Sequence, residues 1–251
     1  MNSGLPLIMP VSSLGKVELQ KAFNLPDSRI QVIHPGITVK RYLEPDQSKC
    51  RREIRERHSL LPDDVVALFV GMNFDLKGLD RIMQSISRFT GRGNKHPALK
   101  LLVVGNGDFK KYQKLAGDLG IAKRVVFAGE RQAVEKYFLA SDFFVLMSYM
   151  DSFGIVVLEA MASGLPVVIS DTVGARDVVE PGKTGYVIGA ETYDRAMQAA
   201  LYTMMQPGLR REMGSKAKRV AVEYDWQQIA ERVAGLYRQR LLRGRPTSNP
   251  H

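Results

Sequence analysis

Short apolar runs alternate with amphipathic segments along most of this chain, and this alternation limits the possible folds more than any other feature. Six runs are rich in Val, Ile, Leu or Phe and predict buried strands at residues 65–70, 99–104, 125–128, 143–147, 167–169 and 186–188. Most are separated by segments with helical spacing that are long enough for crossover helices, at residues 79–89, 110–119, 134–140 and 155–162. The pattern predicts an α/β fold with a Rossmann-like, doubly wound parallel sheet, followed by C-terminal helices at 192–206, 208–223 and 226–242.

The chain has 251 residues and one cysteine, Cys50, which excludes an internal disulfide and suits a reducing compartment. No cationic segment precedes the uncharged first fifteen residues, as a secretion signal requires, and no apolar run reaches the length of a membrane span. We therefore expect a cytoplasmic protein. A further expectation is peripheral contact with the inner membrane surface.

Positive charge exceeds negative charge by ten, and two segments hold part of the excess. Residues 49–58 are interpreted as a solvated helix face. Residues 232–245 belong to a helix with one apolar stripe, so this helix can dock onto a partner domain while its arginines face lipid headgroups. A nucleic-acid partner is not expected, and the tail at residues 243–251 is expected to be disordered.

Two carboxylates beside a predicted helix start indicate a binding site. Asp151 lies just before a helix that Phe153 and Gly154 open, and Glu159 projects from within that helix. The first backbone N–H groups of a helix have no intrahelical partners and favour a bound diphosphate. One carboxylate is then placed for sugar hydroxyls and the other for ribose. The alternative is a capped helix with an incidental glutamate.

Three predicted strands end in glycine at the same relative place, at Gly71, Gly105 and Gly129. Ligands of open parallel sheets bind at the carboxyl ends of the strands, where glycine lets the backbone approach closely. Asn106, in the turn after the second strand, is therefore included among the candidate donor contacts.

The spacing from Asp151 to Glu159 resembles the E-x7-E signature of the retaining glycosyltransferases of family 4, and Lys77 with Gly78 resembles their phosphate-binding loop. The resemblance covers roughly residues 11–240. It implies one half of a GT-B fold, the half that binds a nucleotide-sugar. It also implies that Lys77 neutralises the diphosphate leaving group, that Asp151 orients donor hydroxyls and that Glu159 accepts from ribose hydroxyls. Further donor contacts implied by the resemblance are Gly71, Met72, Ser152, Phe153, Gly154, Ile155 and Val156.

Two positions depart from the family pattern. Asp151 stands where the family usually has Glu, so its side chain is one methylene shorter. Met72 stands where an arginine is usual, and Arg131 is a candidate replacement for the missing charge. These departures leave a non-catalytic nucleotide-sugar-binding module or a pseudoenzyme open as an alternative, and a nucleotide-sugar epimerase of the same architecture is another.

Residues 34–42 and the turn at Lys77 look most like the lipopolysaccharide core glucosyltransferases within the family. This closer likeness implies a donor such as UDP-glucose and a lipopolysaccharide core or other glycan acceptor. The family resemblance implies transfer with retention of configuration. No D-x-D motif and no cluster with metal-ligand spacing occur in the sequence, so metal-independent binding with no cofactor is predicted.

The domain organisation follows from the same likeness. Residues 1–36 are expected to be a remnant of the N-terminal acceptor domain and its linker, and residues 37–242 to be the donor domain. None of the four histidines has a recognisable catalytic context. A separate acceptor domain is therefore an expected partner, and the chain alone is expected to bind donor with little or no transfer.

Overall fold

The computed structural model describes residues 7–90 and 98–243. Its centre is a parallel six-stranded sheet with the strand order β3-β2-β1-β4-β5-β6. The strands are β1 (Val65–Met72), β2 (Leu99–Asn106), β3 (Val125–Gly129), β4 (Phe143–Leu146), β5 (Val167–Ser170) and β6 (Gly185–Ile188). The predicted Rossmann-like sheet is confirmed. Because the chain order reverses between β1 and β4, a ligand crevice is expected beside the carboxyl ends of these two strands.

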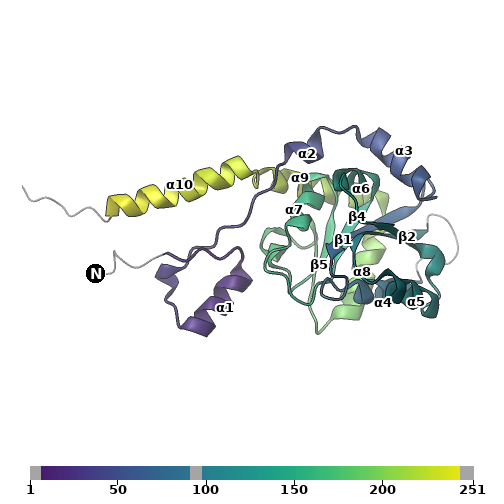
Figure 1. The fold of residues 1–251 in the computed structure, drawn as a ribbon, viewed down its shortest axis with the longest axis horizontal. Helices are drawn as coiled ribbons and strands as arrows, with labels where there is room; N and C mark the ends of the chain where they lie inside the picture. Colours follow the sequence, from purple (N-terminus) through teal and green to yellow (C-terminus); the bar gives the residue numbers. More distant parts are fainter. Residues whose placement is uncertain (1–6, 91–97, 244–251) are drawn as a thin grey trace, which may run out of the picture.

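Helices cover both faces of the sheet (Figure 1). The predicted crossover helices are present as α4 (Leu79–Arg88), α5 (Phe109–Asp118), α6 (Val134–Ala140) and α7 (Ile155–Ala162). The helices after the sheet are α8 (Tyr193–Met204), α9 (Pro207–Val222) and α10 (Trp226–Arg243). Before the sheet lie α2 (Lys40–Leu43) and α3 (Gln47–Arg57). Short 3₁₀ helices are η1 (Asp27–Arg29), η2 (Ala122–Arg124) and η3 (Gly174–Val178).

The core lies between the sheet and these helices. The inner strands are buried on both faces, which explains why their sequences are continuously apolar rather than alternating. Helix α4 buries Leu79, Ile82, Met83 and Ile86, which follow the i, i+3, i+4, i+7 spacing of one helix face. Full burial of each such side chain stabilises the fold by about 1.5–3 kcal/mol.

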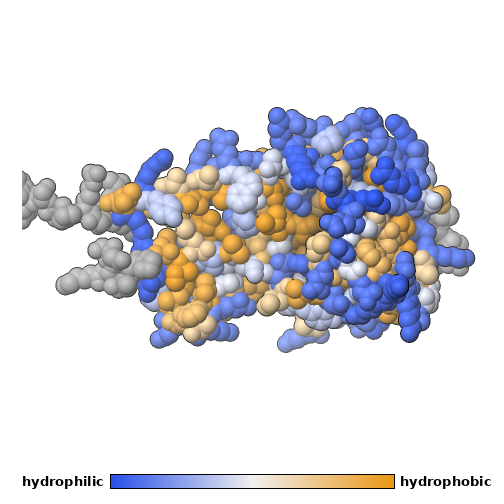
Figure 2. Space-filling view, viewed as in Figure 1, coloured by the Kyte–Doolittle hydropathy of each residue, from blue (hydrophilic) through white to orange (hydrophobic). Residues whose placement is uncertain are grey.

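The N-terminal segment and α10 lie together at one end of the molecule (Figure 1). In this segment a single bridge joins Ile8 and Ile30, and residues 13–23 form α1 (Ser13–Phe23). Figure 2 shows hydrophobic side chains gathered over this end. Phe23 of α1 and Leu241 of α10 are 68% and 72% exposed. Across the described residues, every helix is too short or too polar to span a bilayer.

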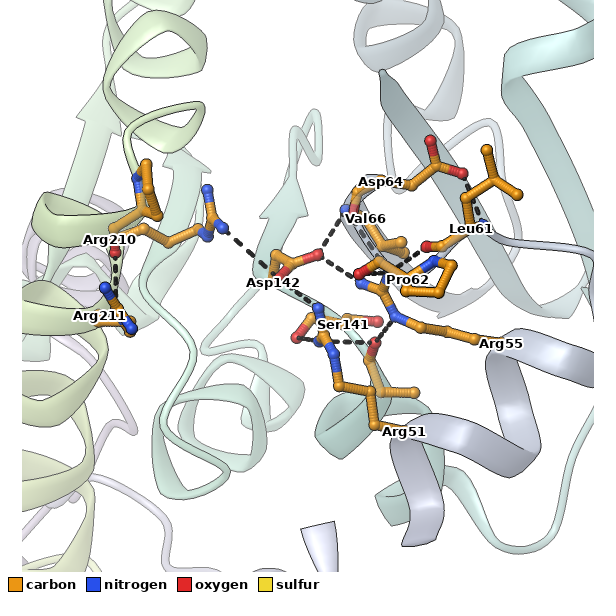
Figure 3. Close-up of polar contacts among 12 residues, drawn as sticks. Arg51, Arg55, Leu61, Pro62, Asp64, Val66, Ser141, Asp142, Arg210 and Arg211 are labelled. Carbon is orange, nitrogen blue, oxygen red and sulfur yellow. Dashed lines mark hydrogen bonds and ion pairs between the residues drawn. The ribbon is translucent and has the colours of Figure 1, made fainter. Parts of the chain in front are cut away.

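The interpretation of residues 49–58 as a solvated face is wrong for two arginines of α3. Arg55 is only 4% exposed, and its guanidinium donates to Asp142 at 2.7 Å, while Arg51 donates to the same carboxylate at 3.0 Å (Figure 3). Arg210 of α9 approaches Asp142 from the other side at 3.7 Å. Their i, i+4 spacing places Arg51 and Arg55 on one helix face. That face turns inward because a buried carboxylate requires charged partners.

Candidate functional site

A cavity of about 600 Å³ opens beside the carboxyl end of β1 and the start of α7, at the point where the strand order reverses. Most of the predicted site residues meet there. The cavity is lined by Gly71, Met72, Lys77, Asp151, Ser152, Phe153, Gly154, Ile155, Val156 and Glu159. The structure also adds lining residues that sequence reasoning did not place in the site, namely Val11, Pro35, Arg41, Tyr42, Val70 and Val134.

Lys77 is positioned by the loop between β1 and α4. Gly78, the N-cap residue just before α4, has a φ of 69°, and a Cβ at this position would lie 1.9 Å from the carbonyl oxygen of Met147. Only glycine fits, so the turn packs directly against the end of β4. A Cβ on Gly71 would lie 3.1 Å from Cγ of Lys77, which shows that the lysine stem runs over this glycine. The two glycines therefore let the ammonium reach the cavity.

Asp151 lines the same cavity and pairs with that ammonium. Its Oδ2 lies 2.6 Å from Nζ of Lys77, and the two side chains are 11% and 24% exposed. The backbone of Asp151 is held in turn, because its N–H donates to the carbonyl of Thr172 and its carbonyl accepts from the N–H of Gly174. The carboxylate is thus fixed by its own loop as well as by Lys77.

The N-terminus of α7 faces the same space. Gly154 precedes the helix with a φ of 82° and has no side chain to cap the first turn. A Cβ there would lie 3.0 Å from Val173 and 3.2 Å from Oδ2 of Asp151, so a larger residue would crowd both. Ile155 and Val156 line the cavity from the first turn. Uncapped N–H groups and the positive end of the helix dipole favour an anion at this position.

Glu159 lies one turn further along α7, half-buried in the cavity wall. The phenol of Tyr42, from α2, is its neighbour. Burial raises the pKa of Tyr42, and the negative charge of the nearby Glu159 carboxylate raises it further. Tyr42 therefore stays protonated in this part of the cavity.

Arg41 brings a second cation to the cavity. Its Nε and Nη2 donate to Oε2 of Glu135 at 3.0 and 2.9 Å, and Nη2 also donates to the carbonyl of Gln132 at 3.2 Å. The hydrogen bond with Glu135 raises the pKa of Arg41 against the opposing effect of burial. Sequence reasoning used residues 40–42 only as part of a family likeness. The sequence did offer one signal that these residues belong to the site: they follow directly after the turn at Pro35 and Gly36, and Pro35 also lines the cavity.

Two predicted site residues lie outside the cavity. Asn106 is exposed at the end of β2, and Arg131 is exposed in the loop between β3 and α6. Arg131 acts instead on His58, whose pKa is lowered first by burial and then by the positive charge of Arg131. The structure thus gives no support to Arg131 as the replacement for the missing arginine, because its charge lies on the α3 side of the loop.

Among the residues described, no group of three or more His, Cys, Asp and Glu side chains is arranged to hold a metal ion. Metal-independent binding therefore stays a prediction. The charged and polar groups of the cavity include an ammonium, a helix N-terminus and two carboxylates.

Comparisons with known proteins agree with this geometry. The model of the family described as glycosyl transferases group 1 matches residues 51–220. The D-inositol 3-phosphate glycosyltransferase of Nocardia farcinica is 31% identical over 229 residues, which are 88% of this chain and 49% of the relative. The enzyme of the same name from Acidothermus cellulolyticus is 29% identical over 241 residues, 91% of this chain and 52% of the relative. The chain thus spans about half the length of the curated relatives it matches.

Solved structures give the same picture. WaaG, a glycosyltransferase involved in lipopolysaccharide biosynthesis, is 26% identical with a TM-score of 0.78, and the match covers 91% of this chain and 61% of WaaG. Anabaena HepE in complex with UDP and glucose has a TM-score of 0.78 at 20% identity, covering 92% of this chain and 62% of HepE. The second match shows the fold alone. The likeness expected from the sequence, to a lipopolysaccharide glycosyltransferase, is confirmed by the first.

Proposed function

Because this chain belongs to the glycosyl transferases group 1 family, we propose that it binds a nucleoside-diphosphate sugar and forms the donor half of a retaining glycosyltransferase of the family 4 type. One observation carries the proposal. The ammonium of Lys77, the uncapped start of α7 and the carboxylates of Asp151 and Glu159 converge on one cavity of about 600 Å³. A cavity in the range of about 300–1,000 Å³ suits a ligand of nucleotide size.

The diphosphate is assigned to the space between Lys77 and the first turn of α7. Cleavage of the glycosyl–phosphate bond leaves negative charge on the leaving diphosphate and develops positive charge at the anomeric carbon. A helix N-terminus contributes only about 0.3–1 kcal/mol in exposed sites and ~2 kcal/mol in partly buried ones. The ammonium must therefore supply much of the stabilisation, and its placement at the glycine turn serves that role.

The two carboxylates lie at different ends of this anion site. Asp151, beside Lys77, is assigned to the hydroxyls of the donor sugar. Glu159, one turn into α7 and beside Tyr42, is assigned to the ribose hydroxyls. Neither carboxylate is placed as a covalent nucleophile in this proposal, so a displacement on the same face of the sugar, without a glycosyl-enzyme, is the proposed route to retention.

UDP-glucose or a similar UDP-sugar is the proposed donor, without a metal or other cofactor. Of the HepE complexes, which have a similar fold, one holds UDP and glucose and another holds UDP, and this supports a UDP-sugar as the first probe. A lipopolysaccharide core or other glycan acceptor is proposed from the likeness to WaaG. The relatives named for D-inositol 3-phosphate make a phosphorylated polyol a second acceptor class to assay.

A separate acceptor domain is part of the proposal. Residues 1–36 are proposed to be the remnant of that domain and its linker, with the donor domain beginning at residue 37. Exposed apolar side chains on α1 and α10, including Phe23 and Leu241, give such a domain a surface to pack against. Catalysis is proposed to take place at the cytoplasmic side, with any membrane contact peripheral.

The test is calorimetric titration of the purified chain with UDP-glucose, UDP, GDP and ADP at moderate salt, alongside Glu159→Ala. Saturable binding with a preference for one base, weakened in the variant, supports the donor site. Binding that shows no base preference and collapses between low and moderate salt would instead indicate a general polyanion surface. If the folded chain binds none of the four ligands, the proposal is wrong.

A further inference from the structure

We propose that Ser12 is a positioning residue for the diphosphate of the donor: its hydroxyl holds the carbonyl of Ser152 and thereby turns the N–H of Phe153 toward the bound anion. This inference rests on the proposed function. It gives a part in donor binding to the segment that is proposed to be a remnant of the acceptor domain.

The loop that leads into α7 has three successive carbonyl groups held by the protein. The carbonyls of Asp151 and Phe153 each accept from a backbone N–H of η3. Between them, the carbonyl of Ser152 accepts from the hydroxyl of Ser12 at 2.7 Å. Of these three hydrogen bonds, the one from Ser12 alone depends on a side chain. A substitution can therefore remove it and leave the other two in place.

Each held carbonyl sets the direction of the N–H that follows it. A trans peptide unit is planar, so its C=O and N–H groups point in opposite directions. The carbonyl of Ser152 and the N–H of Phe153 belong to one such unit, so this N–H points away from Ser12. Within the described parts of the chain, the N–H groups of residues 152–155 donate to no protein acceptor. All four residues line the cavity, so these donors are left for an anion.

Ser12 is itself held firmly. It is 0% exposed, and its oxygen also accepts a hydrogen bond from the first turn of α1 as the N-cap. The backbone N–H of Ser13 donates to Asp177 of η3 at 2.6 Å. A Cβ on Gly174 would lie 2.7 Å from the Cβ of Ser12 and 2.1 Å from the carbonyl oxygen of Ser152. The start of α1 thus packs directly against the site loop, with glycine at the point of contact.

Neighbouring parts of the N-terminal segment also reach the donor cavity. Val11, directly before Ser12, and Pro35 both line it. His34 adds a second link to η3, because its Nε2 lies 3.1 Å from Oδ2 of Asp177. A purely structural role for Ser12, as a cap of α1 in this packed unit, would affect every ligand equally. A role in turning one N–H would affect only ligands with phosphate.

The experiment compares UDP with uridine in the wild type, Ser12→Ala and Ser12→Gly, by calorimetry for UDP and by competition against UDP for uridine. If the wild type prefers GDP or ADP, that nucleotide and its nucleoside are used. The backbone amide signal of Phe153 is followed by NMR during the nucleotide titration. Glycine is accepted at helix N-caps, so Ser12→Gly removes the hydroxyl with less harm to α1, and melting curves check the fold.

Ser141→Ala is the matched control. Ser141 is 3% exposed, and its hydroxyl donates to the carbonyl of Tyr137 at 2.8 Å. Neither residue lines the cavity. The control therefore removes an equally buried hydroxyl from an equally short hydrogen bond to a backbone carbonyl, at a place where no ligand is proposed to bind.

We expect both Ser12 variants to bind UDP roughly threefold to tenfold more weakly than the wild type, as for the loss of one hydrogen bond. Their affinity for uridine should stay at the wild-type value. The Phe153 amide signal should move on addition of UDP in the wild type, and it should move less in both variants. Ser141→Ala should bind both ligands as the wild type does.

Three results would overturn the inference. They are an unchanged affinity for UDP in the Ser12 variants, an equal loss for UDP and uridine, and a wild-type Phe153 signal that UDP leaves unmoved. Should Ser12→Ala fail to fold, Ser12→Gly decides. In each of these results the wild type still binds UDP, so the proposed function stands. A folded wild type that binds none of the nucleotides overturns the proposed function and this inference together.

Discussion

The ammonium of Lys77 and the carboxylate of Asp151 form an ion pair of 2.6 Å in the lining of the cavity. The proposed function assigns these two groups to different parts of one donor, the leaving diphosphate and the sugar hydroxyls. A diphosphate that approaches Lys77 must therefore compete with Asp151 for the ammonium. The pair is mostly buried, so the competition takes place with little screening by solvent.

Replacing Lys77 with methionine tests the diphosphate end of the site. Lys77→Met keeps much of the stem over Gly71 and removes the charge, so affinity for UDP should fall roughly tenfold or more. Affinity for uridine, which has no phosphate, should change little. Calorimetry with both ligands measures the difference. Lys216→Met, which removes an ammonium paired with Glu212 on α9, is the control and should leave both affinities unchanged. An equal loss for UDP and uridine would contradict the assigned role.

Asp151→Asn separates the two uses of this carboxylate. The variant removes the competitor for Lys77, so UDP should bind as well as or better than in the wild type. It also weakens the acceptor for sugar hydroxyls, so any advantage of UDP-glucose over UDP should shrink by roughly tenfold. The ratio of the two dissociation constants is the measurement. A ratio that matches the wild type would show that Asp151 does not contact the sugar.

His58 makes stability sensitive to mild acid. Burial, followed by the charges of Arg131 and Arg57, lowers the pKa of His58 in the folded protein. The unfolded chain, with an ordinary histidine pKa of about 6.5, then binds a proton more readily than the folded chain below that pH. The stability that neutral His58 contributes to the folded protein is therefore fully present above pH ~6.5, and it is lost as the pH falls through the lowered pKa of the folded state.

His58→Gln should reduce this sensitivity. Melting temperatures of the wild type and the variant at pH values of about 7.5 and 5.5 give the comparison. The wild type should lose more stability on acidification than the variant does. Equal losses in the two proteins would mean that other groups account for the whole pH dependence.

Local patterns predicted the sheet well because the inner strands are buried on both faces and each crossover helix shows its own apolar spacing. The bounds of α6 and α7 agree with the prediction residue for residue. The start of α7 was also predictable, since Asp151, Gly154 and Glu159 lie within one short stretch of sequence that a single helix start brings together.

Contacts between distant segments were not predictable in this way. Nothing in residues 40–42 indicates that Tyr42 lines the same cavity as Glu159, because the packing of α2 on α6 and α7 places it there. The surroundings of Arg131 were equally hard to predict: its charge lowers the pKa of His58, and it is not among the residues that line the cavity. From the sequence, the arginines of α3 were predicted to face solvent, because their acceptor, Asp142, lies far away along the chain.

The Asp142 cluster at the amino ends of the strands should matter for stability rather than for binding. Asp142 is 8% exposed, accepts from Arg51 and Arg55, and also accepts from the backbone N–H of Val66 at 2.7 Å (Figure 3). Asp142→Ala leaves the buried guanidinium of Arg55 without its counter-charge, so the free energy of unfolding should fall by about 3–5 kcal/mol.

Asp194→Ala is the matched control for that substitution. Its carboxylate pairs with Arg88, but the two side chains are 66% and 55% exposed, so its removal should cost only about 0.2–1 kcal/mol. Urea unfolding of both variants measures the difference. Losses of similar size would mean that the buried Asp142 carboxylate, with its three arginines, stabilises the fold no more than an exposed ion pair does. A large loss for Asp142→Ala alone would show that the basic segment of α3 ties the helix to the amino edge of the sheet.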